Sequence, residues 1–169
     1  MSVKKLAHPL LVVLFALVLG ACGKSTPQST EMINPGDKTG DFLITTGGQE
    51  GVEPVWELGC DESAGKWSCR LPVGSMVNVS WGIYAEASKG EDLETKWAGH
   101  TYEMVIDGRP VNLKAFGYVD FDHPYRDKIR CWDVVITTDK PGEIEIEGTG
   151  APAGETTESD VAIMIFTAP

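Results

Sequence analysis

Apolar side chains alternate with polar residues or glycine within residues 76–85, and this alternation constrains the fold more than any other stretch. The apolar positions are Val77, Val79, Trp81 and Ile83. The residues between them are Asn78, Ser80 and Gly82. A period of two residues is typical of a β-strand that buries one face and exposes the other. We therefore expect one long strand here, with Trp81 as an anchor of the hydrophobic core.

Further short apolar runs follow residue 41, separated by Gly, Pro and Asp. The expected strands are residues 42–46, 55–58, 66–71, 76–85, 101–106, 116–121, 129–138, 143–148 and 160–166. Asp107-Gly108 predicts a tight hairpin, and Pro110 places the returning strand at a sheet edge. Residues 92–97 are expected to form one helical turn in which Asp92 and Lys96 pair. The pattern predicts an all-β, antiparallel β-sandwich of about eight or nine strands with little or no helix.

The N-terminal residues carry the order of features of a secretory signal. Two lysines precede an apolar run over residues 10–19, and two small residues follow the run. Such a run is too short to span a bilayer as a helix. Residues 19–22, Leu-Gly-Ala-Cys, resemble the lipobox of bacterial lipoproteins. This resemblance implies that residues 1–21 are a lipoprotein signal peptide and that the thiol of Cys22 carries the lipid.

The rest of the chain divides into a tether and one domain. Residues 22–40 are expected to be the lipidated Cys and a flexible tether rich in small and polar residues, and residues 41–169 the β-sandwich domain. The net charge is −11, and removal of Lys4 and Lys5 with the signal peptide makes it −13. Nucleic acid and anionic head groups repel such a surface. We therefore expect no nucleic-acid partner, and an extracytoplasmic protein that its lipid alone holds at a bacterial membrane.

Three cysteines remain for disulfides once Cys22 carries lipid, in a compartment that is oxidising. Cys60 and Cys69 flank a short loop that looks like a hairpin. Cys69 and Cys131 instead have the spacing of the link that joins the two sheets of an immunoglobulin domain. The longer ring would stabilise the fold more in the chain-entropy model, but geometry decides which pair forms.

The strand at residues 129–138 bears on this choice. Its more apolar face is Trp132, Val134 and Ile136. In the next strand only Ile144 and Ile146 can face a core, and a hairpin with Thr138 opposite Ile144 would match the two faces. Cys131 then lies on the other face with Asp133 and Val135, poorly aimed at a partner in the opposite sheet. This favours Cys60–Cys69, although a β-bulge would invert the face and favour Cys69–Cys131.

Three stretches are similar to strand openings and hairpins in secreted bacterial immunoglobulin-like domains, namely residues 71–82, 105–111 and 139–145. The first run places a Gly turn before a strand with an inward Trp. The resemblance implies an immunoglobulin-like sandwich, a fold that mostly binds or spaces other molecules. Ile129 departs from the pattern, in which a Tyr stands two residues before the later Cys.

The sequence holds no motif of a catalytic site. His100 and His123 lack the nearby second His or Cys of a zinc site, and no Gly-x-Ser-x-Gly elbow occurs. Cys131 lies in an expected strand, so a buried, unreactive thiol is the simpler interpretation. We predict no catalytic residue, no cofactor and no enzyme activity. Near one loop, Asp120, Asp122 and Asp127 are candidates for a calcium site, against the simpler interpretation of a solvated acidic loop.

Tyr84 and Trp97 are the candidates for a ligand surface. Tyr84 lies on the expected outward face of the 76–85 strand, and Trp97 lies in a polar loop. Exposed aromatic rings near acids can stack on sugars or anchor a protein. We therefore predict a non-enzymatic cell-envelope lipoprotein whose acidic β-sandwich binds an envelope protein or a glycan. The alternatives are a structural spacer without a specific ligand and an envelope hydrolase that uses paired carboxylates.

Overall fold

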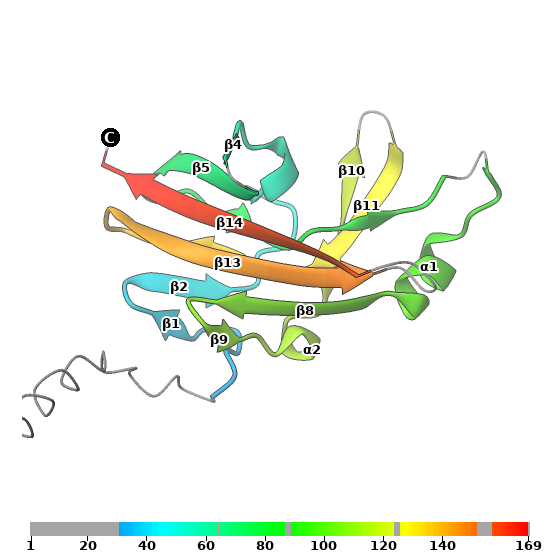
Figure 1. The fold of residues 1–169 in the computed structure, drawn as a ribbon, viewed down its shortest axis with the longest axis horizontal. Helices are drawn as coiled ribbons and strands as arrows, with labels where there is room; N and C mark the ends of the chain where they lie inside the picture. Colours follow the sequence, from blue (N-terminus) through cyan, green and yellow to red (C-terminus); the bar gives the residue numbers. More distant parts are fainter. Residues whose placement is uncertain (1–30, 64, 87–88, 124–125, 152–156, 169) are drawn as a thin grey trace, which may run out of the picture.

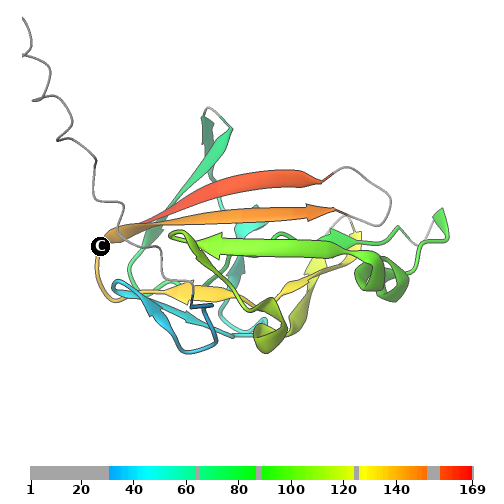
Figure 2. The same ribbon diagram turned by 60° about the horizontal axis from the view of Figure 1, so that its bottom comes forward.

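The computed structural model describes residues 31–63, 65–86, 89–123, 126–151 and 157–168, and these form two stacked layers of β-strands (Figures 1 and 2). The first layer is a six-stranded sheet in the order β4-β5-β14-β13-β8-β9. Its strands are β4 (Asp61–Ser63), β5 (Lys66–Pro72), β14 (Glu158–Thr167), β13 (Gly142–Ala151), β8 (Thr101–Ile106) and β9 (Arg109–Pro110). Neighbours are antiparallel except β5 and β14, which are parallel.

The second layer consists of a five-stranded and a three-stranded sheet. The five-stranded sheet has the order β1 (Lys38–Thr39), β2 (Phe42–Thr45), β12 (Val135–Thr137), β6 (Val77–Asn78) and β3 (Glu53–Pro54). The three-stranded sheet has the order β10 (Tyr118–His123), β11 (Arg126–Trp132) and β7 (Ile83–Tyr84). The chain runs directly from β11 into β12, so the two sheets form one bent layer beneath the first.

The main hydrophobic core lies between these layers and confirms the all-β sandwich. Side chains from β5, β8, β13 and β14 meet side chains from β2, β6 and β12 in one buried cluster. Phe42 of β2 and Phe166 of β14 pack across the interface, with their ring centroids 5.7 Å apart. A smaller cluster lies on the outer face of the second layer, where residues 46–57 cover Cys131 and Val135. The expectation that residues 76–85 expose one face is therefore wrong at Asn78 and Ser80, which are fully buried because this layer is covered on both sides.

The predicted strand at residues 76–85 is interrupted, which corrects the expectation of one continuous strand. Its ends are β6 and β7, and the pairs Val135↔Asn78 and Arg130↔Ile83 keep one register across the gap. Between the two strands, the Val79 N–H still donates to the Val134 carbonyl at 3.0 Å, and side chains supply further hydrogen bonds. The Asn78 amide donates to the Trp132 carbonyl at 3.0 Å, and the Trp132 N–H donates to the Ser80 hydroxyl at 3.1 Å. The strand at 129–138 is split at the same point, into β11 and β12.

The predicted hairpin between residues 129–138 and 143–148 is wrong, although the predicted faces are right. β13 pairs with β14 and β8, while β12 pairs with β2 and β6, so the chain crosses between the layers after Thr138. The predicted apolar face of Trp132, Val134 and Ile136 does pack on the main core, and Ile144 and Ile146 are buried there. Cys131 lies on the other face. The favoured disulfide is confirmed: Cys60 and Cys69 are bonded, with Cα atoms 4.3 Å apart.

The folded domain includes residues that the sequence assigned to the tether. Ile33 is fully buried, forms a bridge with Val111 and donates its N–H to the Pro110 carbonyl at 2.8 Å. β1 then pairs with β2. The domain boundary therefore lies before residue 41, and at least residues 33–40 belong to the sandwich. The signal peptide, Cys22 and the first part of the tether lie outside the described residues.

Helical structure in the described residues is limited to the 3-10 turn η1 (Val55–Glu57) and the helices α1 (Leu93–Gly99) and α2 (Leu113–Phe116). The strand expected at 55–58 is thus η1, and the partner of β5 is β4. The helical turn expected at 92–97 is α1, but Asp92 caps it by accepting from the Thr95 N–H at 2.8 Å. Lys96 pairs with Glu91 rather than with Asp92. None of the described helices is long and apolar enough to cross a membrane.

The Asp107-Gly108 hairpin is confirmed. Both residues have positive φ, 47° and 73°, as a two-residue turn of type I′ requires. The returning strand β9, which contains Pro110, is the edge of the six-stranded sheet as predicted. The turn leads from β8 into β9. On its other side β8 pairs with β13, and it carries Tyr102 of the site described next.

Candidate functional site

The inward face of the six-stranded sheet changes character along β13 and β14. Toward one end the cross-strand pairs are Ile144↔Met164 and Ile146↔Ala162, all buried in the main core. Toward the other end the next inward pairs are Gly148↔Asp160 and Gly150↔Glu158. Glycines and acidic residues thus occupy the positions at which a sandwich normally carries apolar side chains. The core stops at this point, although both strands continue.

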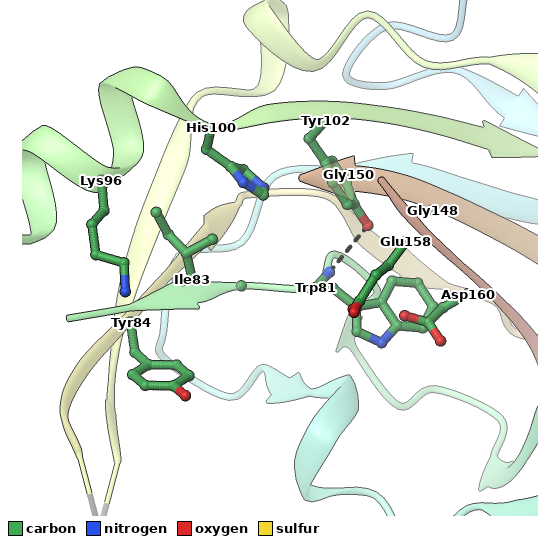
Figure 3. Close-up of a pocket in the computed structure, with 11 residues that line it drawn as sticks. Trp81, Ile83, Tyr84, Lys96, His100, Tyr102, Gly148, Gly150, Glu158 and Asp160 are labelled. Atoms are coloured by element: carbon green, nitrogen blue, oxygen red, sulfur yellow. Dashed lines mark hydrogen bonds between the residues drawn. The ribbon is translucent and has the colours of Figure 1, made fainter. Parts of the chain in front are cut away.

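A cavity of about 370 Å³ opens where the core stops, and we call it the end cavity (Figure 3). Its walls come from β7, β8, β13, β14 and the helix α1. The lining residues are Trp81, Gly82, Ile83, Tyr84, Lys96, His100, Tyr102, Gly148, Gly150, Glu158 and Asp160. Its volume lies in the range of small-molecule sites.

Trp81 separates the end cavity from the core. Its indole packs against the main core on one side and lines the cavity on the other, so its side chain is only partly buried. The backbone N–H of Trp81 donates to the Tyr102 hydroxyl at 3.3 Å, the dashed line in Figure 3. Burial raises the pKa of Tyr102 above its ordinary value, so the phenol is neutral. The predicted core anchor is therefore also part of the candidate site.

The two inward glycines of β13 make room for the ring of Tyr102. A Cβ on Gly150 would lie 2.6 Å from Tyr102 Cδ2, and a Cβ on Gly148 would lie 3.0 Å from Trp81 Cε3 and closer still to the Tyr102 hydroxyl. Side chains do not approach so closely without moving. Glycine weakens a strand interior, and such a glycine commonly marks a close approach by another group. Here the group is an aromatic ring of the cavity wall.

Lys96 of α1 is paired at the cavity wall. Its Nζ lies 3.0 Å from Glu91 Oε2 and 5.4 Å from the centre of the Tyr84 ring. A hydrogen bond from the Glu86 backbone and the contact with Lys96 lower the pKa of the Glu91 carboxyl, which keeps it ionised. The positive charge of Lys96 is thus balanced within the helix and the loop before it.

His100 stands at the end of α1, in a stack of rings. Its ring centroid lies 6.0 Å from that of Trp97 and 5.8 Å from that of Tyr102, with interplanar angles of 28° and 21°. Burial lowers the pKa of His100, so the imidazole is neutral near pH 7. With Lys96 balanced by Glu91, the remaining charges in the cavity are the carboxylates of Glu158 and Asp160. Neither forms an ion pair with a residue that the structure describes.

An ion-pair network centred on the buried Arg130 holds α1 against β10 and β11. The guanidinium of Arg130 binds Asp120 with two hydrogen bonds, at 2.6 and 2.8 Å, and lies 4.2 Å from the centre of the Tyr118 ring. The third nitrogen of the guanidinium, Nη1, lies 2.7 Å from a Glu94 carboxylate oxygen of α1, in the geometry of an ion pair rather than of an aligned hydrogen bond. Trp97 packs on Trp132, with ring centroids 5.0 Å apart. These contacts set the position of Lys96 and His100.

Of the two aromatic residues predicted as a ligand surface, one lines the end cavity and the other does not. Tyr84 lines the end cavity. Trp97 does not; it packs between α1 and the second layer and lines a neighbouring groove that also touches His100 and Tyr102. The sequence analysis missed Glu158, Asp160 and the glycines of β13 as site residues. The signal was the pattern Gly148-x-Gly150 in a strand of otherwise alternating Ile and Glu.

The described acids among the calcium candidates lie beside basic side chains of the protein. The Arg130 guanidinium lowers the pKa of Asp120 and uses both of its carboxylate oxygens. Asp122 lies 4.0 Å from Lys128, and the side chain of Asp127 lies outside what is described. In the described part of the chain, no group of three or more His, Cys, Asp or Glu could hold a metal ion.

The remaining polar candidates lie away from the end cavity. His123 ends β10. Cys131 is buried and not disulfide-bonded, and its burial raises the pKa of the thiol, which disfavours the reactive thiolate.

Comparison with known proteins found no family model, no curated protein and no solved structure that matches this chain. The sandwich architecture alone does not establish kinship with secreted immunoglobulin-like domains, because unrelated proteins share it. That resemblance stays a prediction. The function has to be argued from the end cavity itself.

Proposed function

We propose that this protein is a lipid-anchored binding protein of the bacterial cell envelope, and that its end cavity binds a small saccharide unit of a glycan. The observation that carries the proposal is the replacement of core side chains by glycines, rings and carboxylates at the inward end of β13 and β14. The signal features, the lipobox resemblance at Cys22 and the Cys60–Cys69 disulfide support an extracytoplasmic, oxidising location.

The composition of the cavity favours a saccharide. Tyr84 and Trp81 offer ring faces for stacking on the apolar face of a sugar. Glu158 and Asp160 accept hydrogen bonds, and the neutral His100 and the Lys96 ammonium provide donors. A few polar groups converging in a partly apolar hollow are typical of a ligand site. The volume of about 370 Å³ suits one or two sugar rings.

Binding fits the cavity better than hydrolysis or spacing. Glu158 and Asp160 are two residues apart on one strand, so both project from the same wall. A glycosidase needs its two carboxyl groups on opposite sides of the scissile bond. A spacer, in turn, gains nothing from two glycines inside a strand, since glycine weakens a strand interior, and has no use for a cavity lined by rings and carboxylates. Proteins keep such violations of local rules mainly at functional sites.

The test is a titration of the purified full-length protein, in detergent, with D-glucose, N-acetyl-D-glucosamine and D-glucosamine. We expect saturable shifts of the NMR signals of Trp81 and Tyr84 with at least one of these sugars. Tyr84→Ala should weaken binding about tenfold, the effect of roughly 1.4 kcal/mol. Tyr84→Phe keeps the ring and should bind like the wild type. Absence of a saturable shift with all three sugars at millimolar concentration would refute the proposal.

A further inference from the structure

The negative charge in the end cavity indicates a narrower class of ligand than saccharides in general. This inference rests on the proposed function. Asp160 and Glu158 are inward residues of the first layer, at positions about 7 Å apart along one strand. No ion pair joins either of them to a described residue. The cavity therefore concentrates negative charge that the protein leaves unbalanced.

The other polar groups in the cavity do not neutralise these carboxylates. Glu91 already balances Lys96, whose ammonium lies against the Tyr84 ring. The imidazole of His100 is held neutral by burial, and the Tyr102 hydroxyl accepts the Trp81 N–H. Glu158 is exposed and Asp160 is half-buried, and their two like charges repel each other from one wall of the cavity. A cation that enters the cavity relieves this repulsion.

The surroundings of the carboxylates suit an organic cation. Gly148 pairs with Asp160 across the strands and lies against the Trp81 indole, so the Asp160 carboxylate and the Trp81 ring share one corner of the cavity (Figure 3). An ammonium group has three N–H donors, which suffices to reach both carboxylates. The face of a Trp ring also attracts a cation within about 6 Å.

We propose that the end cavity binds an amino sugar through a free, positively charged amine, held by Glu158 and Asp160 beside Trp81. The sugar ring would extend toward Tyr84, at the opposite wall from Asp160. A metal ion suits the site less well, because no three His, Cys, Asp or Glu side chains among the described residues are grouped closely enough to hold one. The amine therefore sets the specificity, and the rings supply stacking area.

The test compares D-glucosamine with N-acetyl-D-glucosamine and D-glucose in a mildly acidic buffer, with the full-length protein in detergent and calorimetry as the readout. D-Glucosamine should bind at least about tenfold more tightly than either neutral sugar, as expected for a hydrogen bond to a charged group. Its affinity should fall as salt is added, because salt screens the charges. L-Lysine amide serves as an amine that lacks a sugar ring and should bind more weakly than D-glucosamine.

Three variants sharpen the test. Asp160→Asn and Glu158→Gln should each lower the affinity for D-glucosamine about tenfold and leave that for N-acetyl-D-glucosamine unchanged. Glu147→Gln is the matched control, because Glu147 is an exposed acid on the opposite face of the same sheet and loses the same charge. It should change neither affinity. Thermal melting of each variant verifies that it folds.

The outcomes separate this inference from the proposed function. If N-acetyl-D-glucosamine or D-glucose binds as tightly as D-glucosamine, the amine inference is wrong, while the saccharide-binding function stands. If L-lysine amide binds and D-glucosamine does not, the cavity takes amines of peptides and the amino-sugar assignment is overturned. If no sugar and no amine binds, the proposed function itself fails.

Discussion

Gly148 lies tightly against two aromatic side chains of the end cavity. A Cβ at this position would meet the Tyr102 hydroxyl and the Trp81 ring at once. We therefore expect Gly148→Ala to push Tyr102 off β13 and to lower the free energy of unfolding by about 1–3 kcal/mol, the usual cost of overpacking. Urea denaturation measures this change.

Gly59→Ala is the control for this prediction, because a Cβ on Gly59 would meet nothing within 4 Å. It should leave the stability nearly unchanged. Equal stability of Gly148→Ala and the wild type would show that the ring of Tyr102 does not need the space above β13, and the described packing of the cavity wall would be wrong.

Asp160 shows why the site residues were hard to find from the sequence. Both faces of the segment 160–166 are apolar, since Ala162 and Met164 lie on one face and Val161 and Ile163 on the other. Alternation cannot say which face turns inward. The answer comes from the neighbouring strand, where every second residue from Glu143 is an acid and must face solvent. Pairing between strands, which the sequence does not display, then turns Asp160 into the cavity.

At the scale of elements, α1 depends on the Arg130 network for its position. Arg130 has a side chain that is only 6% exposed, with Asp120 at 25% and Glu94 at 70%. Removing a partner from a nearly buried charge is costly, whereas exposed ion pairs contribute little. We expect Asp120→Asn to lower the free energy of unfolding by about 1–3 kcal/mol. Glu94→Gln should change it by no more than about 1 kcal/mol.

The pH dependence of unfolding provides a second measurement on the same variant. Arg130 lowers the pKa of Asp120 below its value in the unfolded chain, which is about 3.9. The stabilisation is therefore complete above that value and is lost as the pH falls through the lower pKa of the folded state. The difference in stability between the wild type and Asp120→Asn should shrink on acidification below about pH 4. A difference that is constant with pH would contradict the role of this ion pair.

Elements that local chemistry specifies were predicted well, and elements that depend on distant partners were not. Residues 101–106 form β8 and turn at Asp107-Gly108 because alternation and positive φ are properties of those residues alone. The hairpin expected after residue 138 failed because the chain could either return beside β12 or cross to the other layer. The observed crossing pairs β13 with β8 and β14, which lie far from it in sequence or follow it. A matching pattern of buried faces is compatible with either path.

At the scale of the whole molecule, the acidic surface and the end cavity act in different ways. The net charge of −11, or −13 without the proposed signal peptide, makes the protein surface repel anionic lipid. The same field draws cations toward the carboxylates of the cavity, which agrees with an amine-bearing ligand. The acidic surface of the domain therefore does not attract it to an anionic membrane.

With the lipid anchor that we propose, Cys22 is the single residue on which membrane association depends. Two or more acyl chains hold a protein stably at a bilayer, and none of the described helices could substitute for them by crossing it. In cells, Cys22→Ala should move the protein from the membrane to the soluble fraction, or leave an uncleaved precursor, while the unfolding of the domain stays the same. Fractionation and mass spectrometry of the N-terminus measure both effects.

Cys131→Ser is the control, because it alters a buried thiol in the sandwich and should leave the protein in the membrane fraction. Were the Cys22→Ala protein cleaved normally and still bound to membranes, a surface of the domain would have to attract the bilayer against its own charge, and the lipid anchor would be wrong.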